Sequence, residues 1–198
     1  MCRTKDIMLL EFGKYSPSEK KLIKRIQGYD WAKLERFWQK IKNRTTPKWS
    51  SGKALEYMLV RAFDLEGAEV VYPYNNIVLN AKEQFDGFVF VRDLGVGFLI
   101  ECKDWQDKVA FDELAKLHGR LTYRMYSTYG LFLSRNGYTP SAVEMMYMVH
   151  PHNILLWEFD EIDECFKNHK FLKALKYKYQ YAMVTADPVI AVLDGINI

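Results

Sequence analysis

The sequence has 198 residues, of which 49% are hydrophobic, 27% charged and 15% aromatic, and its formal net charge is +3. This length fits one domain, or one domain with an added element, and this composition excludes a disordered chain. No run of about 18 apolar residues and no signal-peptide core is present, so we expect a cytoplasmic protein. The cysteines Cys2, Cys102 and Cys165 lie far apart, which favours neither a disulfide framework nor a zinc site.

The first 49 residues are predicted to form a basic helical element. Ser16 with Glu19 makes a capping-box pattern for one helix, and a second amphipathic helix is expected from about Asp30 to Lys42. Between Lys14 and Lys53 there are twelve Lys and Arg residues against three acids. Such an excess suits a polyanionic partner, and a solvated helix face is the alternative. Whether these helices pack on the following domain or extend toward DNA stays open.

Residues 50–198 are predicted to form a single α/β domain. Ser50 or Ser51 would cap a helix that carries Glu56 near the edge of its buried stripe. A first strand is expected over residues 68–72, and residues 77–79 would prolong it or pair with it.

Two apolar, β-prone runs follow, over residues 84–91 and 97–103, and the short polar connection between them predicts adjacent antiparallel strands. Because strand side chains alternate faces, Glu101 and Lys103 would share one face while Cys102 points to the other. If Asp86 pairs near Glu101, two carboxylates and an ammonium group converge. Mg²⁺ prefers such oxygen ligands, and a solvated ion pair on an edge strand is the alternative interpretation.

The remaining elements are expected in alternating order. They are a helix over about residues 108–126, a buried strand at 131–133, a helix from Thr139, a strand at 154–157 and a final helix over about 161–179. The lysines of the final helix are predicted to form a solvated surface. The apolar tail, residues 181–198, would add a strand or pack against a second subunit.

The order of a helix with Glu56, a strand with Asp86, a strand with Glu101 and Lys103, a helix and another strand resembles the PD-(D/E)xK nuclease superfamily. The likeness is greatest to Mrr-type restriction endonuclease domains and covers roughly residues 50–168. One departure is Phe85, which stands where the family name has proline. The resemblance implies a restriction-endonuclease-like central mixed sheet flanked by helices.

The resemblance also implies a DNA phosphodiesterase that uses Mg²⁺ or Mn²⁺, in defence against foreign or modified DNA. Asp86 and Glu101 would hold the metal, with the Cys102 carbonyl as a main-chain ligand, and Lys103 would serve the attacking water. Glu56 would orient the site or hold a second metal.

Four basic residues are candidate nucleic-acid contacts: Lys48, Lys53, Arg120 and Arg124. Simple solvation of these side chains is the alternative. Two other functions stay open, namely a non-catalytic nucleic-acid-binding or assembly subunit with a nuclease-like fold, and a nuclease acting on RNA or branched DNA. The chain's small size leaves a homodimer or a partner protein as further expectations.

Overall fold

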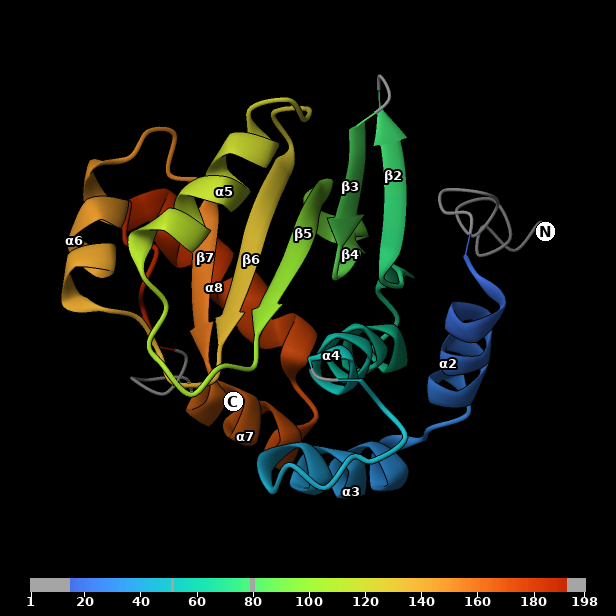
Figure 1. Cartoon of the computed structure of the whole chain (residues 1–198). Coiled ribbons are helices and arrows are strands. Elements are labelled where there is room, and N and C mark those ends of the chain that lie inside the picture. Colours follow the sequence, from blue (N-terminus) through green and yellow to red (C-terminus); the bar gives the residue numbers. More distant parts are fainter. Residues whose placement is uncertain (1–14, 51, 79–80, 192–198) are drawn as a thin grey trace.

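A computed structural model describes residues 15–50, 52–78 and 81–191. A five-stranded mixed sheet forms the centre of the molecule, in the order β1-β4-β5-β6-β7 (Figure 1). Pairing is antiparallel from β1 through β4 to β5, and parallel from β5 through β6 to β7. The strands are β1 (Glu69–Val71), β4 (Gly87–Val91), β5 (Val96–Lys103), β6 (Thr128–Ser134) and β7 (Ile154–Glu158).

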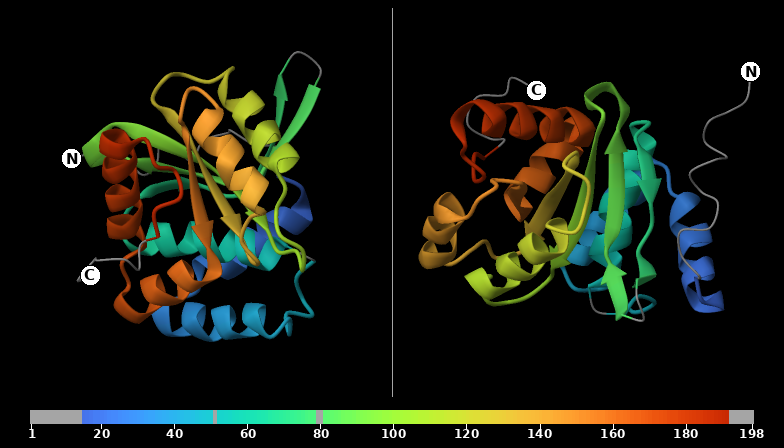
Figure 2. Two further views of the ribbon diagram at one scale, coloured as in Figure 1. Left: turned by 90° about the vertical axis from the view of Figure 1, so that its left-hand side faces the viewer. Right: turned by 90° about the horizontal axis from the view of Figure 1, so that it is seen from above.

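Helices cover both faces of the sheet, as Figure 2 shows. One core joins α4 (Lys53–Leu65), α7 (Phe159–Asn168) and α8 (Phe171–Thr185) to sheet residues that include Ile100 and Leu131. A second core joins α5 (Phe111–Leu121) and α6 (Pro140–Met148) to the opposite sheet face. The prediction of an α/β fold with a mixed sheet flanked by helices is confirmed.

The two N-terminal helices, α2 (Pro17–Gln27) and α3 (Trp31–Lys42), begin where the sequence predicts. Ser16 and Glu19 form the expected capping box, and Asp30 caps α3. Their apolar side chains belong to the same core as those of α4; the buried ones are Ile26, Leu34, Phe37, Trp38 and Ile41. The helices therefore pack on the sheet domain through α4 and do not stand apart from it.

The predicted strand over residues 84–91 is interrupted at Asp86. The segment before it, β3 (Ala81–Phe85), pairs with β2 (Tyr74–Val78) in a separate two-stranded sheet, and β4 begins only at Gly87. Gly87 has a φ of +156°, and a Cβ there would lie 2.5 Å from Cγ2 of Val60 on α4. The strand breaks here because the chain turns where it passes close to α4, at a position that favours glycine. The two sides of the turn belong to different sheets.

Three other boundaries also differ from expectation. The N-cap of α4 is Gly52 rather than a serine, with Ser51 outside the described residues. The helix expected to reach residue 126 ends at Leu121, and Met125 beyond it is exposed. The single final helix is two helices, because the chain reverses at His169, whose φ is +50°.

Lys178 on α8 is the clearest correction among the lysines predicted to be solvated. Its side chain is fully buried, and its Nζ lies 2.6 Å from Oε1 of Glu161 on α7. The break at His169 folds α8 back across α7, which brings the two charges together. The expected tail also differs, since α8 continues to Thr185, and residues 192–198 lie outside the described part. None of the described helices is long and apolar enough to cross a membrane.

Candidate active site

A cavity of about 340 Å³ lies at the carboxyl end of β5, beside the start of α4 and the turn between β3 and β4. Polar side chains from all three elements line it. The lining residues are Gly52, Glu56, Gln84, Asp86, Glu101, Cys102, Lys103, Asp104, Trp105 and Arg120. The structure thus brings together the four residues that the sequence singled out, Glu56, Asp86, Glu101 and Lys103.

Strand alternation places the two motif residues of β5. Ile100 and Cys102 point into the core that contains α4, whereas Glu101 and Lys103 point to the other face and keep 13% and 16% of their side-chain surface exposed. The predicted division of faces is confirmed.

Asp86 is fixed by the neighbouring strand. Its Oδ2 accepts a hydrogen bond of 2.8 Å from the backbone N–H of Cys102. Burial raises the pKa of the Asp86 carboxyl well above its usual range, and the nearby carboxylates of Glu56 and Glu101 raise it further. The expected meeting of Asp86 with Glu101 therefore occurs, although Asp86 occupies a turn and not a strand.

Glu56 lies in the first turn of α4 and is buried. Its Oε2 has no hydrogen-bond partner among the described residues, and the only cation paired with it there is Lys53, whose Nζ is 3.6 Å away. Burial raises the pKa of the Glu56 carboxyl, an effect that Lys53 partly offsets. A buried carboxylate oxygen without a hydrogen-bond partner costs free energy, so a further cation at this position would stabilise the charged form of Glu56.

Lys103 is held between two carboxylates. Its Nζ lies 2.9 Å from Oε1 of Glu101 and 3.0 Å from Oε2 of Glu113 on α5. Burial lowers the pKa of the ammonium, but Glu101 and Glu113 more than offset this, and the pKa lies above its ordinary value. Sequence reasoning missed Glu113; its place in the first turn of the helix after the motif was the available signal.

Two arginines from α5 and the turn after it reach the same region. Arg120 Nη1 lies 2.9 Å from Oε2 of Glu101, and its Nε lies 3.6 Å from Oε1 of Glu83 on β3. Arg124 Nη2 lies 2.6 Å from Oε2 of Glu83. Glu83 is a second residue that the sequence did not single out, because a lone glutamate in a polar stretch carries no signal.

The other two candidate contacts differ in position. Lys53 pairs with Glu56 at the cavity, whereas Lys48 is exposed and does not line it.

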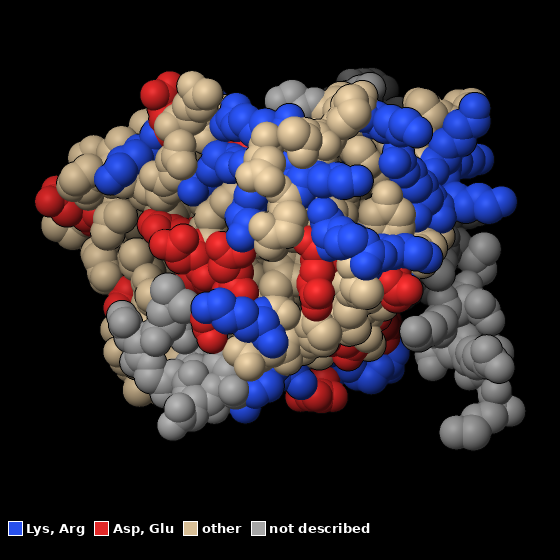
Figure 3. Space-filling view, turned by 90° about the horizontal axis from the view of Figure 1, so that it is seen from below, with Lys and Arg blue, Asp and Glu red and all other residues tan. Residues whose placement is uncertain are grey.

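Figure 3 shows the end of the molecule to which β5, β6 and β7 point. Lys and Arg side chains gather most densely over one half of this face, on the side where Figure 1 places α2. The segment that contains α2 and α3 carries the excess of Lys and Arg found in the sequence.

The donor set of the cavity suits a hard divalent cation. Within the described residues no three His, Cys, Asp or Glu side chains are close enough together to hold a metal as they stand, and Glu101 is occupied by Lys103 and Arg120. Mg²⁺, however, commonly takes only one or two carboxylates and completes its shell with water. The mutual repulsion of Asp86, Glu56 and Glu101 would be relieved by such an ion, so these residues fit it.

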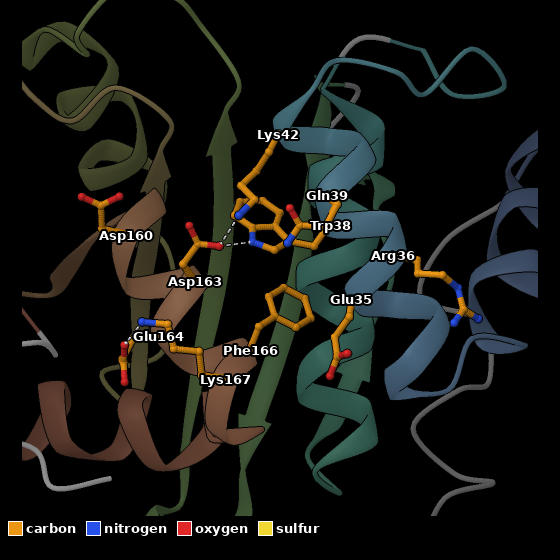
Figure 4. A pocket seen from close by; sticks show the side chains of 10 residues that line it. All are labelled: Glu35, Arg36, Trp38, Gln39, Lys42, Asp160, Asp163, Glu164, Phe166 and Lys167. Carbon is orange, nitrogen blue, oxygen red and sulfur yellow. Dashed lines mark hydrogen bonds and ion pairs between the residues drawn. The ribbon is translucent and has the colours of Figure 1, made fainter.

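A larger hollow, of about 910 Å³, lies between α3 and α7 (Figure 4). Its centre is Asp163, which accepts hydrogen bonds from Trp38 Nε1 at 2.6 Å and Lys42 Nζ at 2.7 Å. Arg36 points away from the hollow in this view. None of the motif residues lines it, and its one central carboxylate is already satisfied, so it is not the candidate site.

The Mrr_cat family, described as restriction endonuclease, matches residues 48–166 of the chain. No curated protein sequence matches. Among solved structures, the protein of unknown function AF1548 has 15% identity and a TM-score of 0.45, covering 54% of this chain and 57% of its own. The DNA modification-dependent restriction endonuclease AspBHI has 15% identity and a TM-score of 0.33, covering 79% of this chain and 36% of its own.

The chain thus spans little more than half the length of the first of these structures and about a third of the second. Likenesses this weak do not bear on the assignment, which rests on the family match over more than half of the sequence. That match contains the strand, helix and turn that line the cavity. The chain therefore belongs to the Mrr_cat family of restriction endonucleases.

Proposed function

We propose that this protein is a Mg²⁺- or Mn²⁺-dependent nuclease that hydrolyses DNA phosphodiester bonds, in defence against foreign or modified DNA. The observation that carries the proposal is the convergence of Glu56, Asp86, Glu101 and Lys103 on one cavity in a chain of this family. The proposal places the enzyme in the cytoplasm. It also leaves open whether it acts as a homodimer or with a partner protein.

In this proposal Asp86 and Glu101 hold the divalent ion, together with the Cys102 carbonyl, and Glu56 holds it through water or binds a second ion. The ion, when bound, supplies positive charge to the phosphate and lowers the pKa of coordinated water. The N–H of Cys102 orients Asp86 through the 2.8 Å hydrogen bond. Preorganisation of this kind avoids the cost of arranging the carboxylate during the reaction.

Lys103 acts in this proposal as a cation and hydrogen-bond donor. Glu101 and Glu113 keep its pKa above the ordinary value, so the ammonium stays protonated at neutral pH. A charged ammonium at this position orients the attacking water and stabilises charge on a non-bridging phosphate oxygen.

The proposal divides the chain into a basic helical element, residues 1–49, and a nuclease domain, residues 50–198. Lys48, Lys53, Arg120 and Arg124 are proposed to contact the DNA backbone. The position of Arg120 in the cavity wall, and of Lys53 and Arg124 beside it, supports this for three of the four, since phosphate contacts fix the register of a duplex without reading its sequence.

The test is cleavage of supercoiled, linear, single-stranded and junction DNA, and of RNA, with Mg²⁺ or Mn²⁺. Asp86→Ala and Lys103→Ala are each expected to lower the cleavage rate by at least about 100-fold. Matched controls are Asp93→Ala and Lys167→Ala, which remove an exposed acid and an exposed lysine away from the cavity. Cleavage that survives the first two substitutions would contradict the assigned site.

One observation favours a second candidate, a non-catalytic nucleic-acid-binding or assembly subunit. Lys103 and Arg120 already neutralise Glu101, so this carboxylate is satisfied without a metal ion. DNA binding without cleavage of any of the substrates, in either metal, would support this candidate. Cleavage of RNA or junctions alone would instead narrow the substrate of the nuclease.

A further inference from the structure

Arg120 and Arg124 form a paired cationic group at one side of the cavity. The ring centre of Phe85 lies 5.7 Å from the guanidinium carbon of Arg120 and 5.1 Å from that of Arg124. Guanidinium groups over a buried aromatic ring have few conformations available, which preorganises their N–H groups. Both arginines pair with one carboxylate, that of Glu83, and Arg120 also donates to Glu101.

Glu83 occupies the position where an anion would bind this pair. Its two oxygens are divided between the two arginines, with Oε1 at 3.6 Å from Arg120 and Oε2 at 2.6 Å from Arg124. A carboxylate and a phosphodiester each offer arginine two anionic acceptor oxygens on one central atom. Between 22% and 31% of the surface of these three side chains is exposed, so water and solutes can reach the ion pairs.

Arg120 also links this group to the site. The same guanidinium donates to Glu101 at 2.9 Å and lies against Glu83, so it stands between a proposed metal ligand and the β2–β3 hairpin. A phosphate bound between Arg120 and Arg124 would therefore lie next to the proposed reaction centre.

We propose that Arg120 and Arg124 form a binding site for a DNA backbone phosphate beside the one that is cleaved, and that Glu83 occupies this site until DNA displaces it. The inference rests on the proposed function, since it assumes a polynucleotide substrate. Glu83 then acts as a substrate-mimicking latch, which weakens binding of any polyanion and ties the β2–β3 hairpin to α5 in the DNA-free protein.

Neutralising the latch has a measurable consequence. Glu83→Gln leaves Arg124 without a carboxylate partner among the described residues and leaves Arg120 paired with Glu101 alone. DNA then no longer has to displace a carboxylate, and DNA affinity is expected to rise about three- to tenfold in low salt. A purely structural role for Glu83 would change stability without changing DNA affinity.

The experiment measures anisotropy of a short fluorescent DNA duplex with the full chain, in EDTA so that no cleavage occurs, from about 50 to 200 mM salt. The matched control is Glu164→Gln, since Glu164 also pairs with a cation, Lys167 at 2.8 Å, and is similarly exposed but lies on α7 away from the cavity. Glu164→Gln removes one negative charge, as Glu83→Gln does. The Arg124→Ala and Glu83→Gln/Arg124→Ala variants complete a double-mutant cycle, and circular dichroism confirms that each variant is folded.

We expect DNA affinity to rise with Glu83→Gln and to stay unchanged with Glu164→Gln. Most of the rise should be lost when the Arg124 side chain is also removed. Equal affinities of wild type and Glu83→Gln for the DNA would overturn the proposal, as would a gain that persists in the double variant. If only the latch proposal is wrong, metal-dependent cleavage is still observed. If only the nuclease proposal is wrong, no cleavage is observed but Glu83→Gln still raises the affinity for DNA.

Discussion

Replacing Asp86 with asparagine is expected to stabilise the metal-free fold while abolishing its response to Mg²⁺. The asparagine amide would keep an oxygen to accept the Cys102 N–H hydrogen bond and would remove the negative charge that faces Glu56 and Glu101. An Asp whose pKa is raised on folding stabilises the protein below its unfolded-state pKa. That contribution is lost as the pH rises through the folded-state pKa. At neutral pH the wild type therefore carries this cost and the Asp86→Asn variant does not.

The magnitude follows from the charge that is removed. Replacing a carboxylate that faces two like charges with a neutral amide of nearly the same shape is expected to raise the free energy of unfolding by about 1–2 kcal/mol. For a domain of this size the gain corresponds to a rise in Tm of roughly 2–8 °C. At ten times its Kd, Mg²⁺ would raise the stability of the wild type by about 1.4 kcal/mol.

The assay is thermal unfolding between about pH 4 and 8, with EDTA or with Mg²⁺. Wild-type stability should fall with rising pH more steeply than that of Asp86→Asn, and Mg²⁺ should raise only the wild-type Tm. The control is Glu66→Gln: burial raises the pKa of Glu66 too, but its oxygens accept the N–H groups of Phe171 and Leu172 at the start of α8. That variant should be destabilised. A metal-free Tm that falls for Asp86→Asn would refute the reasoning.

Three further substitutions test the fold and the site. Gly87→Ala should lower the free energy of unfolding, measured in urea, by about 1–3 kcal/mol because the added Cβ would meet Val60. Gly95→Ala, which also has a positive φ but lies in open space, should lower it by only about 1 kcal/mol. Equal losses for the two variants would contradict the close approach of Gly87 to Val60. Lys178→Met should cost about 3–5 kcal/mol by leaving Glu161 without this cation, and Lys178→Met/Glu161→Gln should recover much of this loss; no recovery would mean that packing dominates. Glu113→Gln should lower kcat about tenfold with little change in KM, since Lys103 keeps its charge but loses one anchor, and an unchanged kcat would show that Glu101 alone positions Lys103.

The parts of the site that local sequence patterns determine were predictable. Strand alternation alone placed Glu101 and Lys103 on one face of β5, and the capping box at Ser16 marked the start of α2. Glu56 was different, because only the family resemblance distinguished it from any solvent-facing glutamate on a helix. Its burial depends on how α4 packs against the sheet, which no pattern within the helix reveals.

The errors occurred where distant segments decide the structure. The break at Asp86 depends on Gly87 meeting Val60 of α4, which lies well before it in the chain, and on β3 leaving the main sheet to pair with β2. Lys178 was predicted to be solvated because its partner Glu161 lies across a helix break at His169, and histidine is not a typical helix stop. Glu83 and Glu113 were missed for the same reason, since each acquires a role only through a cation from another element.

In the ion pairs beside the cavity, the charges of the described carboxylates are balanced by cations. Lys53 pairs with Glu56, Lys103 and Arg120 pair with Glu101, and Arg120 and Arg124 pair with Glu83. A divalent ion on Asp86 and Glu101 would upset this balance by releasing Arg120 and Lys103, and a phosphate would restore it by taking up the released cations. Metal and DNA should therefore bind cooperatively, each increasing the other's affinity by the same factor. Titrations with Ca²⁺ in place of Mg²⁺, with and without DNA, would measure that factor. A factor of one would show that the arginines do not exchange their carboxylate partners for phosphate.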